Sequence, residues 1–201
     1  KVNNLMTENL TPEEYNRLAN LLNEDKDIQA VNLLRLALFT GMRRGELFKL
    51  KWKDINFNIK IILIRDPKSG LDEKIPLNEM ALSVLDKHPK TESEFVFPGL
   101  GGNQRKTTPR PLRRIIKKAG LNNFRPFHGL RHAYASTLAS SGKVDLYKLQ
   151  KLLTHKSPLM TQRYAHLSND ALMEASNVIS DLTKSHQNIT ELDEHKVKKG
   201  T

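Results

Sequence analysis

The sequence predicts a mainly α domain that carries a small antiparallel β-sheet. Apolar residues recur at helical spacing in both halves of the chain, and the helical segments begin at capping residues. Between these halves, Ile59–Ile64 is rich in isoleucine and is followed by turn residues, a pattern typical of a strand. Strand signals confined to the middle of a helical sequence indicate an α+β domain with one small sheet.

Three helices are predicted in the N-terminal part of the chain. Thr11 can cap the first, because a proline follows it and Glu14 can complete a capping box. The second is expected at about Asp27–Phe39, and Gly41 can end it in the left-handed conformation. A short third helix is expected at about Arg44–Leu50.

The strand signals lie in the middle of the chain. Ile59–Ile64 is expected to pair with Lys74–Leu77 across the turn Asp66–Gly70. Because proline cannot donate to a strand ladder, Pro76 places the second strand at an edge of the sheet. A third short strand is predicted at Glu94–Pro98, which makes the predicted sheet three-stranded.

The remaining sequence is predicted to be helical, apart from its polar ends. Residues 1–10 are polar and weakly patterned, which predicts a linker, and we expect the polar residues 183–201 to form a mobile tail. One further helix is expected from about Thr108, with Pro111 near its start. The others are expected at Asn78–Asp86, Gly129–Ser140, Val144–Leu153, Pro158–Tyr164 and Asp170–Leu182.

Composition narrows the class of partner. Lysine and arginine number 33 against 22 acidic residues, which gives a formal charge of +11. A basic surface favours a polyanionic partner, most often nucleic acid, although a basic protein that is merely soluble stays open. The absence of cysteine excludes disulfides and thiolate chemistry and fits a reducing cytoplasm. No run of 18 apolar residues is present, so no membrane span is expected.

Two boxes of residues carry the functional signal. The first is Thr40-Gly41-Met42-Arg43-Arg44-Gly45-Glu46-Leu47, and the second begins with His128-Gly129-Leu130-Arg131-His132 and continues through Leu153-Thr154-His155 to Tyr164. In both order and spacing, including the nine residues from His155 to Tyr164, they resemble the boxes of the tyrosine recombinases, also called the phage integrase family. Thr154 stands where that family usually has glycine.

The resemblance covers about Thr11 to Leu182 and implies the family's catalytic-domain fold. It implies a linker from a missing N-terminal DNA-binding domain at 1–10, a catalytic domain at 11–182 and a mobile C-terminal tail at 183–201. The implied function is that of a site-specific recombinase or integrase of a phage or mobile element, acting in the cytoplasm on double-stranded DNA. The implied full-length protein is a homotetramer on DNA, and no cofactor is expected. Docking of Asp170–Leu182 onto a neighbouring subunit and an intramolecular cap both stay open.

Cleavage of a phosphodiester by a tyrosine requires nearby arginines and groups that transfer protons. A phosphodiester resists attack by an anion, so a nucleophilic tyrosine needs cationic donors around the phosphate. The planar fork of arginine can bind two phosphate oxygens, which makes Arg43 and Arg131 the candidates, one from each box. Tyr164 would be the nucleophile that forms a covalent 3′-phosphotyrosine.

The remaining catalytic candidates handle protons. Ionising a tyrosine at pH 7 costs about 4 kcal/mol. A cation at about 4 Å offsets a similar amount, part of which the scissile phosphate cancels. We therefore expect proton loss coupled to attack, with His128 as the acceptor and His155 as a donor to a phosphate oxygen. The resemblance implies that Lys68, in the turn between two strands, protonates the leaving 5′ oxygen. His132 is expected to be structural, packed behind Arg131, and Glu46 to orient Arg43.

The sequence also bears on metal binding and, at other residues, on contact with DNA. His128 and His132 are four apart, but the zinc-protease pattern wants glutamate after the first histidine, where Gly129 stands, so no metal site is predicted. A basic cluster is either a solvated surface or a set of DNA-backbone contacts, and we favour contacts, which position DNA without reading its sequence. The predicted DNA-binding residues are Arg44, Arg105, Lys106, Arg110, Arg113, Arg114 and Lys117, and Lys118 belongs to the same cluster.

Two alternatives stay open at this point. A type IB DNA topoisomerase uses the same kinds of catalytic residue, although the form of the second box favours a recombinase. A non-catalytic DNA-binding module would use its arginines and histidines only for phosphate contacts, and would keep every DNA activity in a Tyr164→Phe variant.

Overall fold

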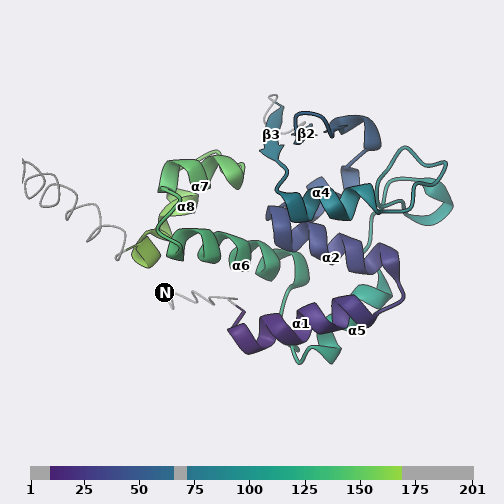
Figure 1. Cartoon of the computed structure of the whole chain (residues 1–201), viewed down its shortest axis with the longest axis horizontal. Coiled ribbons are helices and arrows are strands. Elements are labelled where there is room, and N and C mark those ends of the chain that lie inside the picture. Colours follow the sequence, from purple (N-terminus) through teal and green to yellow (C-terminus); the bar gives the residue numbers. More distant parts are fainter. Residues whose placement is uncertain (1–9, 66–71, 169–201) are drawn as a thin grey trace, which may run out of the picture.

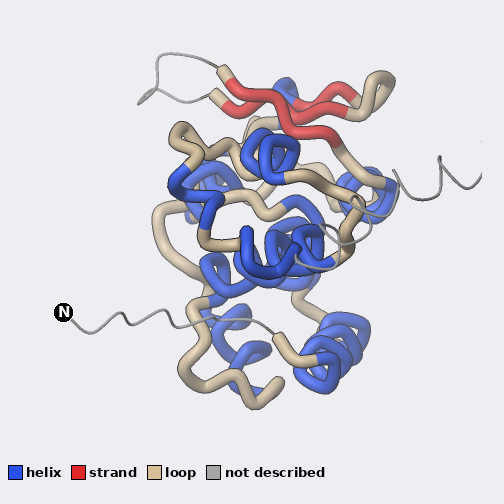
Figure 2. The backbone as a smooth tube through the Cα atoms, turned by 90° about the vertical axis from the view of Figure 1, so that its left-hand side faces the viewer, coloured by secondary structure: helices blue, strands red, loops and turns tan. Residues whose placement is uncertain are grey.

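The computed structural model describes residues 10–65 and 72–168. These residues form a mostly helical domain with a small antiparallel sheet at one end, as the sequence predicts (Figures 1 and 2). The helices are α1 (Pro12–Glu24), α2 (Ile28–Thr40), α3 (Arg44–Lys49), α4 (Glu79–Asp86), α5 (Arg110–Lys118), α6 (Pro126–Ser140), α7 (Leu146–Leu152) and α8 (Leu159–Gln162). The strands are β1 (Ile55–Asn56), β2 (Ile61–Ile64) and β3 (Glu73–Pro76), and short 3-10 helices lie at Trp52–Asp54, Leu100–Gly102 and Ala165–Ser168.

Several predictions lie outside the described residues. They are nearly all of the linker at 1–10, the turn that carries Lys68, the helix expected at Asp170–Leu182 and the tail at 183–201.

Helix α2 is the centre of the domain. It is apolar on almost every side, and its residues Ala30 to Leu34 and Leu36 to Ala37 are buried. A helix that is hydrophobic all round must be covered all round. Accordingly α4, α5 and α6 pack against α2, and α1 packs against α5 (Figure 1).

The predicted helix caps around α1 and α2 are confirmed. The Thr11 hydroxyl accepts a hydrogen bond from the Glu14 backbone N–H, and the Glu14 carboxylate accepts one from the Thr11 backbone N–H. Gly41 ends α2 with a φ of 64°. A Cβ at Gly41 would also lie 2.5 Å from Cδ1 of Tyr134 on α6, so the first box can turn here only with glycine.

The predicted sheet is correct in strand number within the described residues but wrong in one strand. The order is β1-β2-β3, and β3, with Pro76, is an edge strand as predicted. The third member is Ile55–Asn56 instead of Glu94–Pro98. Asn56 Oδ1 accepts from the backbone N–H groups of Asn58 and Ile59, and this turn folds the chain back so that β1 pairs with β2. Residues 94–97 run beside residues 50–52 instead, with a single bridge between Lys51 and Phe95.

Helix α6 begins earlier than predicted. Its predicted start was near Gly129, whereas the helix begins at Pro126. Proline suits this position because the first N–H groups of a helix have no partner within the helix. The second box therefore lies inside the helix from the outset, which places His128 and His132 on one face. Helix α5 begins at Arg110, close to the predicted start near Thr108, and α7 and α8 are shorter than predicted.

Gly129 allows α6 to pack against the preceding loop, and its replacement is expected to destabilise the fold. A Cβ at this position would lie 2.2 Å from Cε2 of Phe124. The Gly129→Ala variant should lower the free energy of unfolding by about 1–3 kcal/mol, the usual cost of overpacking. Urea denaturation would measure this, with Gly45→Ala as a control because nothing lies within 4 Å of its added Cβ. Equal stability of the Gly129→Ala variant and the wild type would contradict the packing argument.

Candidate active site

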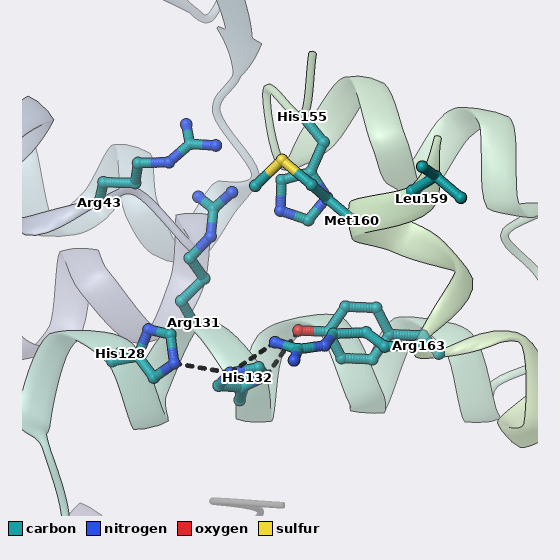
Figure 3. A pocket seen from close by; sticks show the side chains of 9 residues that line it. Arg43, His128, Arg131, His132, His155, Leu159, Met160 and Arg163 are labelled. Carbon is teal, nitrogen blue, oxygen red and sulfur yellow. Dashed lines mark hydrogen bonds between the residues drawn. The ribbon is translucent and has the colours of Figure 1, made fainter. Parts of the chain in front are cut away.

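The predicted catalytic residues that the structure describes converge on one pocket of about 410 Å³ (Figure 3). They come from the start of α3, from α6, from the turn after α7 and from the segment after α8. The pocket is lined by Arg43, His128, Arg131, His132, His155, Leu159, Met160, Arg163 and Tyr164. Five of its polar members are catalytic residues predicted from the sequence, whereas His132 and Arg163 were not among those predictions.

Arg43 is held by three groups from two elements. Its Nη1 donates to Glu46 Oε1 at 2.7 Å and to Thr154 Oγ1 at 2.5 Å, and its Nη2 donates to the Thr154 carbonyl at 3.1 Å. Glu46 also accepts from the Arg43 backbone N–H at 2.7 Å, so it orients Arg43 as expected. The Arg43 side chain remains 38% exposed, which leaves it accessible from the pocket.

Arg131 is the buried counterpart, with a relative exposure of 8%. Its Nη1 donates to the Gly41 carbonyl at 2.7 Å, and its Nη2 donates to the Leu153 carbonyl. Burial, with a further contribution from the nearby Arg43 cation, lowers the pKa of Arg131 to about 10, so the group stays charged at pH 7. The arginine has five N–H donors. Two of these N–H groups donate to the Gly41 and Leu153 carbonyls and fix the orientation of the guanidinium. The other N–H groups remain for a ligand.

His155 lies at the rim between the arginines and α8. Its Nδ1 is 2.9 Å from the hydroxyl of the buried Thr161. Burial, followed by the Arg131 and Arg43 cations, lowers the pKa of His155 to about 4, so the ring is neutral at pH 7. A neutral ring that accepts at Nδ1 carries its proton on Nε2. Such a ring can donate to an anion in the pocket.

Tyr164 is anchored in a small apolar cluster of its own. The residue is 5% exposed and clusters with Ala135 and Ala139 of α6, Leu149 of α7 and Leu153 directly after α7. Burial raises the pKa of Tyr164, and the nearby Arg163 and Arg131 cations oppose that effect. The tyrosine is therefore protonated at pH 7 and would have to lose its proton to act as a nucleophile.

The hydrogen-bond partner of Tyr164 is His132. Tyr164 Oη lies 2.6 Å from His132 Nδ1, and His132 Nε2 lies 2.9 Å from His128 Nε2. The expectation that His132 packs behind Arg131 is wrong. His132 follows His128 by four residues, so both side chains lie on the same face of α6, and the His132 ring contacts His128 and Tyr164. The four-residue spacing of His128 and His132 is the sequence signal for this pairing. Within the described residues, no group of three potential ligand side chains is placed to hold a metal ion.

Arg163 adds a third cation to the site. Its Nη1 lies 3.5 Å from His132 Nε2 (Figure 3). The Arg163 cation also acts on Tyr164, where it opposes the rise in pKa that burial causes. Three guanidinium groups and a neutral imidazole N–H around one pocket form a site for an anion, because each can donate to anionic oxygen. Among the residues that the structure describes, Glu46, paired with Arg43, is the one carboxylate within ion-pair distance of these cations. The position directly before Tyr164 was the only sequence signal for Arg163.

The predicted DNA-binding residues lie outside this pocket. None of the seven lines it. Two guanidinium groups are engaged in the fold: Arg114 binds both carboxylate oxygens of Asp25 at 2.7–2.9 Å, and Arg105 donates to the carbonyls of Phe97 and Pro98. The other five members are exposed: Arg44 on α3, Lys106 in the loop before α5, and Arg110, Arg113 and Lys117 on α5. Their contact with DNA stays a prediction.

Comparison with known proteins decides the family. A model of the phage integrase family matches residues 8–170. The chain belongs to the phage integrase family. The tyrosine recombinase XerA of Pyrococcus furiosus is 31% identical over 193 residues, which are 90% of this chain and 66% of that protein. The chain spans about half to two thirds of the length of the first curated relatives it matches.

Solved structures place the fold within the same family. A crystal structure of XerA recombinase matches with a TM-score of 0.67 and 28% identity over 83% of this chain and 63% of that one. The catalytic domain of bacteriophage HP1 integrase matches with a TM-score of 0.66 over 84% of this chain and 93% of that domain. At 22% identity the second likeness shows the fold alone. The fold is that of a tyrosine recombinase catalytic domain, as the sequence boxes predicted.

No helix in the part of the chain that the structure describes has the length and apolar character needed to cross a membrane.

Proposed function

We propose that this chain is the strand-cutting and rejoining domain of a site-specific DNA recombinase. The observation that carries the proposal is the convergence of Arg43, Arg131, His155 and Tyr164 on one pocket from separate segments of the chain. Two arginines and a neutral histidine supply donors for a phosphodiester, and a protonated tyrosine lies at the edge of the same space. Membership of the phage integrase family supports double-stranded DNA as the substrate.

The reaction would be a transesterification. Tyr164 Oη attacks the scissile phosphorus, the bond from phosphorus to the 5′ oxygen breaks, and a 3′-phosphotyrosine forms. Arg43, Arg131 and His155 would stabilise the charge on the non-bridging oxygens, which is greatest in the transition state. Lys68 would protonate the leaving 5′ oxygen. Attack by a 5′ hydroxyl on the phosphotyrosine reverses the steps and reseals the strand.

The proton of Tyr164 would leave through the histidine pair. His132 Nδ1, at 2.6 Å, is within direct reach of Tyr164 Oη, whereas His128 contacts His132 through the two Nε2 atoms. Proton transfer from Tyr164 to His132, with His128 accepting from His132 Nε2, keeps the charges balanced as the new bond forms. His128 would then be the second group in the path instead of the direct acceptor.

The assembly that performs recombination would be larger than this chain. We propose that the full-length protein forms a homotetramer on two duplexes. An N-terminal DNA-binding domain, joined through the linker at 1–10, would make further contacts with the DNA. The C-terminal segment 170–201 would supply either a cap or a contact to a neighbouring subunit. Placement in the cytoplasm, where such DNA is found, belongs to the same proposal.

A nicked suicide substrate tests the proposed reaction. Incubating the full-length protein, and separately this chain, with a nicked duplex from the ends of the element should give a protein–DNA adduct that survives denaturing electrophoresis and disappears after protease digestion. DNA binding by both proteins without any adduct would contradict the proposal and favour a non-catalytic module. Relaxation of a supercoiled plasmid that lacks the element's ends would favour a topoisomerase.

A further inference from the structure

The turn after α7 contains an unusual backbone conformation. Thr154 has a φ of 49°, in the left-handed region. Its N–H donates to the Lys151 carbonyl, and the His155 N–H donates to the Gln150 carbonyl, each at 3.0 Å. This pair of bonds is the Schellman pattern that ends many helices, and the residue at the position of Thr154 is usually glycine. A β-branched residue with this φ is a genuine outlier.

A threonine in this conformation costs free energy that glycine would avoid. A contact made by its side chain can offset that cost. The Thr154 side chain points back to the first box. Its hydroxyl accepts from Arg43 Nη1 at 2.5 Å and lies 3.4 Å from Glu46 Oε1, and the residue is 8% exposed.

The backbone of the same turn reaches both arginines. The Thr154 carbonyl accepts from Arg43 Nη2 at 3.1 Å, and the Leu153 carbonyl accepts from Arg131 Nη2. Glycine at position 154 could keep both carbonyl contacts, because they depend on the backbone alone. The hydroxyl contact to Nη1 is what threonine adds.

We propose that Thr154 is a positioning residue for Arg43, and that its hydroxyl fixes the guanidinium fork in the plane needed to bind phosphate. Nη1 then carries two bonds, to Glu46 and to Thr154, and Nη2 carries one, so the guanidinium cannot turn about its last bond without breaking contacts. Nε and the remaining Nη2 hydrogen are left to face a ligand. The catalytic meaning of this role rests on the proposed function, whereas the constraint on Arg43 does not.

Three substitutions separate the hydroxyl from the backbone. Thr154→Ser keeps the hydroxyl, Thr154→Val keeps the β-branched shape without it, and Thr154→Gly removes both hydroxyl and strain. Thr137→Val, at an exposed site on α6, is the matched control. The loss of one hydrogen bond to a charged group is expected to lower the single-turnover rate of adduct formation about tenfold to hundredfold in the Val and Gly variants. The Ser variant and the control should stay within about threefold, since the hydroxyl or the site is intact.

The Gly variant gives the sharpest contrast, because its melting temperature should equal or exceed that of the wild type while its cleavage rate falls at saturating DNA. A purely structural role for Thr154 predicts the opposite, with cleavage following stability. Wild-type cleavage rates in the Val and Gly variants would overturn the proposal.

A second measurement does not depend on cleavage. Guanidinium NMR of the wild-type chain, with the Arg43 signals assigned through Arg43→Lys, should show slow rotation of the Arg43 fork in the wild type and in Thr154→Ser. Rotation should be measurably faster in Thr154→Val, which keeps the contacts to Glu46 and to the Thr154 carbonyl but loses the hydroxyl contact. Identical Arg43 signals in the wild type and Thr154→Val would overturn the positioning role even if the chain proves unable to cut DNA. Normal Arg43 behaviour together with a missing adduct would instead count against the proposed function.

Discussion

The Tyr164→Phe variant is expected to bind DNA like the wild type and to form no covalent adduct. The phenol oxygen would be the atom that attacks phosphorus, and phenylalanine lacks it. Loss of a nucleophile of this kind lowers the rate by at least about four orders of magnitude. The ring itself packs in the cluster of Ala135, Ala139, Leu149 and Leu153, so phenylalanine should preserve the fold. Adduct formation on nicked DNA and DNA affinity would be measured side by side.

The same variant discriminates between the functions considered above. A folded Tyr164→Phe protein, shown by its melting temperature, that still forms the adduct would mean that another residue is the nucleophile. Loss of the adduct with unchanged DNA affinity assigns the chemistry to the Tyr164 hydroxyl and leaves phosphate binding to the rest of the pocket.

The second large effect is expected at Arg131. Arg131→Lys keeps a positive charge but loses the planar guanidinium. That group donates to the Gly41 and Leu153 carbonyls and still has N–H groups for a ligand. The rate of adduct formation should fall by about 10²–10³, the usual cost of removing a donor that stabilises developing charge. DNA affinity should change little, because most phosphate contacts would lie outside the pocket.

Arg113→Lys is the matched control for this substitution, since Arg113 is exposed on α5 and does not line the pocket. Its adduct-forming rate should match that of the wild type. Equal rates for Arg131→Lys and Arg113→Lys would show that any cation suffices at position 131, and would remove the argument from guanidinium geometry.

Much of the fold could be predicted because its signals are local. The capping box at Thr11 and the left-handed Gly41 depend on a few neighbouring residues, and both are present as expected. The strand predicted at Glu94–Pro98 failed for a non-local reason. Its residues have strand-like side chains, but the free edge of β2 is taken by Ile55–Asn56 through a tight turn.

The site was predictable to the extent that residue type and spacing determine it. The motif positions of Arg43, Arg131, His155 and Tyr164 all reach the pocket. The contact between Arg43 and Thr154 joins residues that are 111 positions apart, and no periodicity in the sequence predicts it. The expected position of His132 behind Arg131 is wrong, because His132 contacts Tyr164, 32 residues away, and His128, one helical turn earlier on α6.

The most direct test is to identify the residue that carries DNA. The adduct formed on nicked DNA would be digested with nuclease and protease, and the nucleotide-bearing peptide would be sequenced by mass spectrometry. The account predicts a nucleotide attached through its 3′ phosphate to Tyr164. A nucleotide on any other residue, or one attached through a 5′ phosphate, would contradict it.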